Sequence, residues 1–268
     1  MKVGLYTILV NTCDAFADCW NPFFKLLDCY WSPCDAPIIL NTEVLSFDWP
    51  GLSMAASRIG LGRSRRLTWS EALLKCLERI ENDLVLYVQE DYFLNGQVGV
   101  GLIDEFAMLM RTENIATIQL TPFGSSGSFR PATHPLLWII GEHAPYRIAL
   151  QAALWKKERL KFYLREHENA WQFELFGTIR SWRTADTFYA LNRSVFNCGV
   201  REVFPYVKTG IIKGQWYAPA VVELFRDHGI DIDFSRRGFY RERSRLLERL
   251  QTLSRITRHP GSLMRSLR

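Results

Sequence analysis

The sequence predicts an α/β fold in which a mainly parallel sheet is flanked by helices. Strand and helix patterns alternate from Lys2 to Leu120, which is typical of parallel strands joined by crossover helices. The segment from Leu84 to Val88 is apolar at every position, as expected of a strand buried on both faces. Two adjacent acids, Glu90 and Asp91, follow it. Because open α/β sheets bind ligands beyond the carboxyl ends of their strands, we expect a functional site there.

The first elements come from local patterns. Lys2 to Val10 reads as a strand, because Gly4 and Thr7 interrupt its apolar run and no cleavage site of a signal peptide follows. Phe16 to Tyr30 has apolar residues at mostly helical spacing and is expected to form the first crossover helix. Ala36 to Leu40 is a short second strand.

The segment from Ser46 to Arg66 shows little periodicity and holds several arginines close together. It is either a loop over a phosphate site or a long connection. Thr68 to Glu71 fits a capping box and opens an amphipathic helix that ends near Ile80. The central strand at Leu84 to Val88 follows, and then a helix at Val98 to Met110.

A strand is expected at Ile115 to Leu120, and a loop rich in Gly, Ser and Pro at Gly124 to Pro135. The remaining strands are predicted at Tyr146 to Trp155, Phe188 to Leu191 and Ile211 to Trp216. The remaining helices are predicted at Lys156 to Glu166, Glu168 to Phe176 with Asn169 as N-cap, and Pro219 to His228.

The charge distribution divides the chain into a folded domain, residues 1–234, and a basic tail, residues 235–268. Residues 236–268 contain ten Arg and two Glu, a net charge of +8, whereas the whole chain carries +5. Five apolar residues of the tail share one helical face: Leu246, Leu247, Leu250, Leu253 and Ile256. This pattern suits a helix on an anionic membrane surface, a helix docked on its own domain, or a partly disordered basic tail.

Composition places the chain among cytoplasmic globular proteins, with the basic tail as a possible contact to the inner face of the cytoplasmic membrane. Apolar residues make up 48% and charged residues 23%, and no stretch reaches the roughly 18 apolar residues of a membrane span. The six cysteines form no C-x-x-C pair and are expected to be reduced. Nine Trp, ten Tyr and seventeen Phe would suit a surface that stacks on sugars or bases, although aromatic residues fill cores more often.

Several motifs, taken in order, resemble the bacterial GT-A-type glycosyltransferase family of cell-surface polysaccharide and lipopolysaccharide assembly. The matching pieces are Cys13-Asp14, Trp20 to Phe24, Trp69 to Glu71 with Leu73, Glu90 to Leu94, Tyr146 to Lys156, Ala170 to Glu174 and Lys213 to Trp216. They span roughly residues 1–234. The resemblance implies a Rossmann-like GT-A domain that transfers a sugar, with hexosyltransferase-like activity, from a UDP- or GDP-linked donor to a glycan or glycolipid acceptor.

The resemblance also implies roles for individual residues. Asp91 would bind Mn²⁺ or Mg²⁺, which neutralises the departing diphosphate, although Gln89 replaces the first acid of the usual D-x-D motif. Glu174 would be the catalytic base. The nucleotide and its phosphates would contact Thr12, Asp14, Glu90 and Lys213, and the sugars would contact Trp171, Trp216 and Arg147.

Two alternatives remain open at this stage. A nucleotidyltransferase also combines an α/β sheet with a metal, but Thr7 to Asp14 lacks the Gly-rich phosphate loop expected near its N-terminus. A non-catalytic protein could instead bind glycans through its aromatic residues and RNA or lipid through its tail. We do not expect nucleic acid to be a partner.

Overall fold

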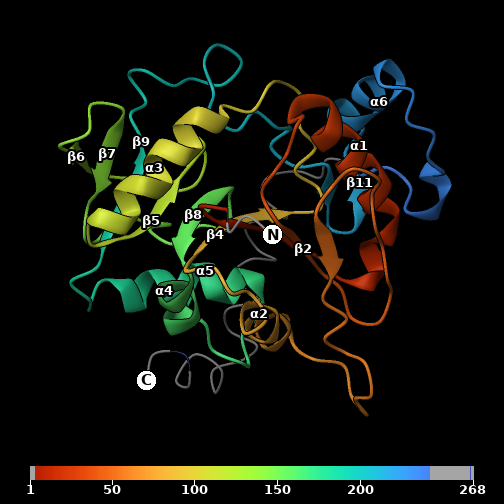
Figure 1. Cartoon of the computed structure of the whole chain (residues 1–268), viewed down its shortest axis with the longest axis horizontal. Helices are drawn as coiled ribbons and strands as arrows, with labels where there is room; N and C mark the ends of the chain where they lie inside the picture. The colour runs from red at the N-terminus through yellow and green to blue at the C-terminus, as the bar shows by residue number, and fades with distance from the viewer. Residues whose placement is uncertain (1–3, 242–265, 267–268) are drawn as a thin grey trace.

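A computed structural model describes residues 4–241 and Ser266. Its centre is a nine-stranded sheet with the strand order β3-β2-β1-β4-β8-β5-β9-β7-β6 (Figure 1). The strands are β1 (Thr7–Asn11), β2 (Ile38–Asn41), β3 (Met54–Ala56), β4 (Leu84–Gln89), β5 (Ile115–Gln119), β6 (Phe129–Pro131), β7 (Leu137–Ile140), β8 (Ala153–Lys156) and β9 (Thr187–Leu191). A separate hairpin pairs β10 (Ile211–Ile212) with β11 (Gln215–Trp216).

The sheet is mostly parallel, as the sequence predicts. Strands β3, β2, β1 and β4 pair in parallel, and β5 pairs in parallel with β9. Strand β8 lies antiparallel between β4 and β5, and β7 is antiparallel to both β9 and β6. The carboxyl ends of β1, β2 and β4 therefore meet at one edge of the sheet, where ligand sites of open α/β sheets lie.

Helices cover both faces of the sheet (Figure 1). They are α1 (Trp20–Tyr30), α2 (Trp69–Leu77), α3 (Val100–Thr112), α4 (Lys157–Tyr163), α5 (Ala170–Ser181) and α6 (Ala218–Asp227), with 3₁₀ helices η1 (Asp14–Cys19) and η2 (Phe234–Arg236). Residues of α1, α3 and α6 share one core cluster with one set of strand side chains. Residues of α2, α4 and α5 share the other. The prediction of helices on both faces is confirmed.

Strand β4 shows why its apolar run predicts burial on both faces. Leu86 and Val88 point into the first core cluster, and Val85 and Tyr87 into the second. Successive side chains of a strand alternate between the two faces. A strand without polar positions can therefore only lie inside a covered sheet.

Some elements differ from the predictions. Strands β3, β6 and β7 lie in segments expected to be loops or left unassigned, and each has only three or four residues. The expected strand at Tyr146 to Trp155 shortens to β8, and Tyr146 adopts a φ of 52° that no strand contains. Lys213 and Gly214, with φ of 51° and 80°, form a tight turn that splits the expected strand into β10 and β11.

The folded domain extends past the predicted boundary at residue 234. Arg237 bonds to Asp18, Ala15 and the carbonyl oxygen of Gly214. The ring of Phe239 packs on that of Phe234 at 5.0 Å between centroids. These contacts make residues 235–241 part of the domain. The predicted tail helix from Leu246 to Ile256 lies outside the described residues.

Two further expectations concern the whole chain. The six cysteines are all free thiols, as predicted. No helix within residues 4–241 combines the length and the apolar character needed to cross a membrane.

Candidate functional site

Polar side chains at the carboxyl ends of β1, β2 and β4 form a chain of hydrogen bonds. Ser57 donates to the Oδ1 of Asn41 at 3.1 Å, and Asn41 donates to Asn11 at 2.8 Å. Asn11 donates to the hydroxyl of Tyr87 at 3.2 Å, and Gln89 donates to the same hydroxyl at 3.2 Å. These bonds satisfy the buried amides and fix the end of each strand relative to its neighbours.

A cavity of about 270 Å³ opens beside this chain, between the ends of β1 and β2 and the start of α2. We call it the β1–β2 cavity. Its lining includes Asn11, Thr12, Thr42, Glu43, Arg66 and Trp69. It thus combines amides, hydroxyls, one carboxylate, one guanidinium and one indole ring. Such a mixture can stack on an aromatic base, bond to hydroxyls and meet a phosphate.

Helix α2 brings Trp69 to this cavity. Thr68 and Glu71 form the predicted capping box: the hydroxyl of Thr68 accepts from the Glu71 amide at 3.1 Å, and Glu71 accepts from the Thr68 amide at 2.8 Å. Trp69 follows the cap directly, and its ring lies 5.7 Å from that of Phe173 on α5. The sequence shows the cap but gives no sign that Trp69 borders a cavity.

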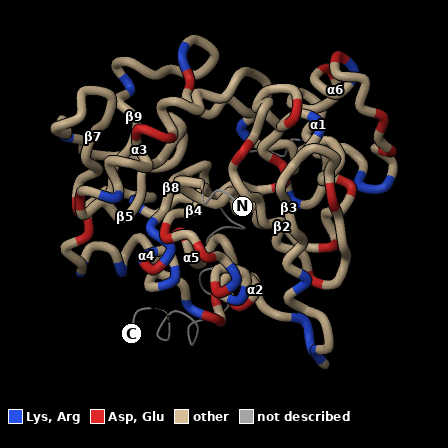
Figure 2. The backbone as a smooth tube through the Cα atoms, viewed as in Figure 1, with Lys and Arg blue, Asp and Glu red and all other residues tan. Residues whose placement is uncertain are grey.

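The loop before α2 supplies positive charge at the rim of the cavity. Four of its residues are arginines, Arg58, Arg63, Arg65 and Arg66, and Figure 2 shows basic residues gathered on this loop between β3 and α2. Arg66 lines the cavity and pairs with Glu43 at 2.5 Å. Arg65 pairs with Glu71 at 2.5 Å and does not line the cavity.

Of two residues predicted to contact the nucleotide, Thr12 lines the β1–β2 cavity and Asp14 does not. Thr12 does line the cavity, and its hydroxyl accepts from the indole nitrogen of Trp20 at 3.0 Å. Asp14 does not line it, because its carboxylate accepts the backbone amides of residues 43–45 at 2.8, 2.9 and 3.1 Å. Asp14 holds the loop after β2 in place, so its predicted contact with the nucleotide is corrected to a supporting role.

Asp91 accepts hydrogen bonds from residues 209–211, at the start of β10. Its Oδ2 accepts the hydroxyl of Thr209 at 2.9 Å and the amides of Gly210 and Ile211 at 3.2 Å each. All three donors bind Oδ2, and none of these bonds involves Oδ1. Gln89 contributes an amide that already donates to Tyr87. Within residues 4–241 and Ser266, no group of three or more His, Cys, Asp or Glu could hold a metal. The described residues thus offer no cluster of three such ligands for the metal implied at Asp91.

Asp91 instead positions the β10–β11 hairpin that carries Lys213. The Lys213 ammonium lies 5.6 Å from the centroid of the Tyr240 ring. Arg237 bonds to the carbonyl of Gly214 in the same turn, at 3.4 Å. The hairpin is therefore fixed from both ends.

Glu90 is a buried carboxyl next to Asp91. Burial, reinforced by the charge of Asp91, raises its pKa to about 8. The nearby Arg237 opposes this rise. Burial therefore favours the protonated form of Glu90 in the folded protein.

We predict that the wild type loses stability as the pH rises and that the variant Glu90→Gln does not show this loss. Folding raises the pKa of Glu90 from 4.5 to about 8, so the folded state holds a proton that the unfolded state releases. The free energy of unfolding of the wild type should therefore fall between pH 5 and 8.5, by on the order of 3 kcal/mol from this group. Urea denaturation at both pH values measures the fall. An equally large fall in the variant would contradict the prediction.

Glu174 lies on α5, whose start is fixed by Asn169 and Gln172. Asn169 accepts from the Gln172 amide at 2.9 Å, and the Gln172 side chain accepts from the Asn169 amide at 3.0 Å, which completes a capping box around the predicted N-cap. Glu174 accepts from the amide of Leu150 at 2.7 Å. Burial raises the pKa of Glu174 above its ordinary value.

Leu150 connects Glu174 to the chain of hydrogen bonds at the strand ends. Its carbonyl oxygen accepts from the hydroxyl of Tyr92 and from Gln89 at 3.4 Å. Glu174 bonds to the amide of the same residue. A continuous set of contacts thus runs from the β1–β2 cavity through Tyr87 and Gln89 to Glu174. Trp171, one helical turn before Glu174, is half-buried.

Two predicted sugar-binding residues lie elsewhere. Trp216 is fully buried among Phe93, Phe225 and Phe234, so it belongs to the core and no ring face is open to a sugar. Arg147 is 2% exposed and borders a different cavity. Thr12 thus lines the β1–β2 cavity and Glu174 is linked to it through Asn11, Tyr87, Gln89 and Leu150, whereas Trp216 and Arg147 lie outside this site.

Comparisons with known proteins give no assignment. No protein-family model matches the chain, and no curated protein matches it. A solved structure described as the crystal structure of a mycobacterial protein aligns with 84% of this chain and 76% of its own, at 12% identity and a TM-score of 0.46.

Proposed function

We propose that the protein is a nucleotide-sugar-dependent glycosyltransferase of the GT-A type. The observation that supports this most is the connection between the β1–β2 cavity and the carboxylate of Glu174, through hydrogen-bonded side chains at one sheet edge. A transferase of this kind needs a nucleotide site next to a base, at a position where an acceptor can approach. The resemblance in the sequence points to the same activity.

The donor nucleotide would occupy the β1–β2 cavity. Trp69 offers a ring for the base, and Thr12 and Thr42 offer polar groups for hydroxyls. Arg66, at the rim, is placed to meet a phosphate, with which a guanidinium forms paired hydrogen bonds. The donor would be UDP- or GDP-linked, and its sugar would extend toward Glu174.

Charge on the departing diphosphate would be met by basic side chains. Arg66 lies at the cavity and Lys213 lies on the hairpin that Asp91 fixes. Such cations stabilise charge that develops on a leaving phosphate. No step of this proposal is routed through Mn²⁺ or Mg²⁺, because among the described residues no group of three or more His, Cys, Asp or Glu could hold a metal.

Glu174 would act as the base of an inverting transfer. The acceptor hydroxyl gives its proton to Glu174 as its oxygen forms a bond to the anomeric carbon of the donor. The bond from that carbon to the diphosphate breaks at the same time, and the diphosphate leaves with the electron pair. Trp171, one turn away on the same face of α5, would pack against the acceptor sugar. The acceptor would be a glycan or glycolipid, which the basic tail could approach at the inner membrane surface.

We predict that one nucleotide sugar stabilises the protein without a divalent cation. A ligand at 100 times its Kd raises the free energy of unfolding by about 2.7 kcal/mol. Thermal-shift measurements with UDP-, GDP- and CMP-sugars, in EDTA and in Mn²⁺, would detect this. We expect a shift with UDP- or GDP-sugars that persists in EDTA. A shift only with Mn²⁺ would contradict the metal-free part of the proposal, and no shift with any donor would contradict the function.

Arg66→Gln and Arg65→Gln provide a matched pair for locating the donor. The two side chains are neighbours on one loop, are 66% and 64% exposed, and each pairs with a glutamate. Only Arg66 lines the β1–β2 cavity. Arg66→Gln should weaken donor binding about tenfold or more, and Arg65→Gln should leave it unchanged. Equal effects of both changes would place the donor outside this cavity.

A further inference from the structure

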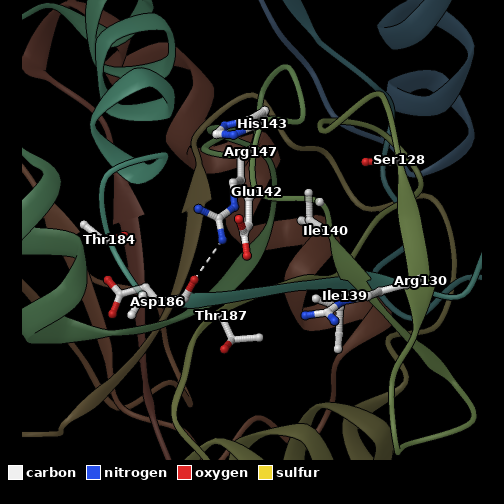
Figure 3. A pocket seen from close by; sticks show the side chains of 12 residues that line it. Ser128, Arg130, Ile139, Ile140, Glu142, His143, Arg147, Thr184, Asp186 and Thr187 are labelled. Atoms are coloured by element: carbon white, nitrogen blue, oxygen red, sulfur yellow. Dashed lines mark hydrogen bonds between the residues drawn. The ribbon is translucent and has the colours of Figure 1, made fainter.

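A second cavity, of about 430 Å³, lies at the amino end of β9 (Figure 3). The strand directions place it at the opposite sheet edge from the β1–β2 cavity. Its walls come from the ends of β6 and β7, the segment 141–147 and the segment 184–187. The two cavities share no lining residue. We call it the β7–β9 cavity.

The inner wall of this cavity contains a deeply buried guanidinium. Arg147 is 2% exposed and its side chain lies 4.3 Å above the Phe188 ring. Its two terminal nitrogens donate to the backbone carbonyls of Ser181 at 2.7 Å and Asp186 at 2.8 Å, and its Nε has no partner. Among the described residues, Arg147 forms no ion pair within 4 Å.

This is unusual for a buried charge, and the same domain offers a comparison. Arg180 is also buried, but it makes a two-pronged ion pair with Glu168 at 2.6 and 2.7 Å. Buried charges are costly unless a charge of opposite sign compensates them. Arg147, more deeply buried, has only neutral carbonyl oxygens as partners. None of its direct hydrogen-bond partners therefore carries a negative charge.

The nearest acids, Glu142 and Asp186, act on Arg147 only electrostatically and form no ion pair with it. The carboxylate of Asp186 bonds to Arg159 at 2.7 Å and to the hydroxyl of Tyr163 at 2.5 Å. Glu142 is exposed at the wall and forms no hydrogen bond among the described residues. Figure 3 shows Arg130 reaching into the cavity from β6, on another side from Arg147 and Glu142. Two arginines therefore border one space.

We propose that the β7–β9 cavity binds the phosphate or carboxylate group of a small polyhydroxylated ligand, such as a phosphorylated or acidic sugar. Arg130 would contact the anionic group directly, and Arg147 would attract it through the low-dielectric wall. Glu142 and Thr187, which also line the cavity, would accept from the hydroxyls of the ligand. This inference stands on the contacts of Arg147 and does not depend on the proposed transferase activity.

The test compares four compounds by calorimetry at constant ionic strength: inorganic phosphate, glucose 6-phosphate, glucuronate and glucose. We expect one or both anionic sugars to bind, inorganic phosphate to bind more weakly, and glucose not to bind. The two anionic sugars separate phosphate from carboxylate recognition. Binding of none of the anions, or of glucose as tightly as its phosphate, would overturn the proposal.

Substitutions of two exposed wall residues, Arg130 and Glu142, should change anion binding in opposite directions. Arg130→Gln removes a positive charge and should weaken binding about tenfold or more. Glu142→Gln removes a negative charge and should strengthen it several-fold. Arg66→Gln, in the other cavity, should change nothing. Unchanged binding in both wall variants, or loss of binding in Arg66→Gln, would show that the anion binds elsewhere and would overturn the proposal.

Discussion

Glu174→Gln should lower the rate of sugar transfer by about 10²- to 10⁴-fold, the usual contribution of a general base. Glutamine retains the oxygen that accepts from the Leu150 amide at 2.7 Å, so the position of α5 should not change. It lacks only the ability to take a proton. Steady-state kinetics with the donor found by thermal shift measures the loss. Full activity in the variant would exclude Glu174 as the base.

The pH profile distinguishes a base from a positioning residue. Burial raises the pKa of Glu174 above 4.5, and a base works only when deprotonated. The kcat/KM of the wild type should therefore fall as the pH decreases through that raised pKa. The residual activity of Glu174→Gln should lack this acidic limb. Donor binding, measured by thermal shift, serves as the control and should be the same in both proteins because Glu174 does not line the β1–β2 cavity.

The features that the sequence predicts correctly depend on neighbours along the chain. The capping box at Thr68 and the two-faced burial of β4 follow from a few adjacent residues. The order of strand and helix from residue 2 to 120 fixes the parallel half of the sheet. Thr12 follows β1 directly, so its place at the carboxyl edge of the sheet, where it lines the β1–β2 cavity, follows from the strand order.

The features that the sequence does not predict depend on distant partners. The bond from Thr209 to Asp91 joins residues 118 positions apart, which no local pattern predicts. Trp216 reads as a stacking surface until Phe93 and Phe225 are seen to enclose it. The link from the cavity to Glu174 requires Leu150, which precedes an antiparallel strand inserted between β4 and β5. The local sequence does not predict that β8 inserts between β4 and β5.

Glu168→Gln should destabilise the domain by about 3 to 5 kcal/mol, because it leaves the buried charge of Arg180 without its partner. Arg180 and Glu168 have side chains 8% and 0% exposed, and Arg180 also donates to the carbonyl oxygens of Tyr163 and Ser266. Glu168 directly precedes the cap of α5, so the pair fixes the helix that carries Glu174. Urea denaturation measures the change in the free energy of unfolding.

A surface pair and a double variant show whether the unpaired charge causes this loss. Glu158→Gln breaks the exposed pair with Lys161 and should cost no more than about 0.5 kcal/mol. Replacing both buried residues, as Glu168→Leu with Arg180→Met, removes both charges and should restore much of the stability lost in Glu168→Gln. If the double variant is as unstable as the sum of its single changes, the loss comes from packing and hydrogen bonds instead. Restoration would show that the loss in Glu168→Gln comes from the unpaired charge of Arg180.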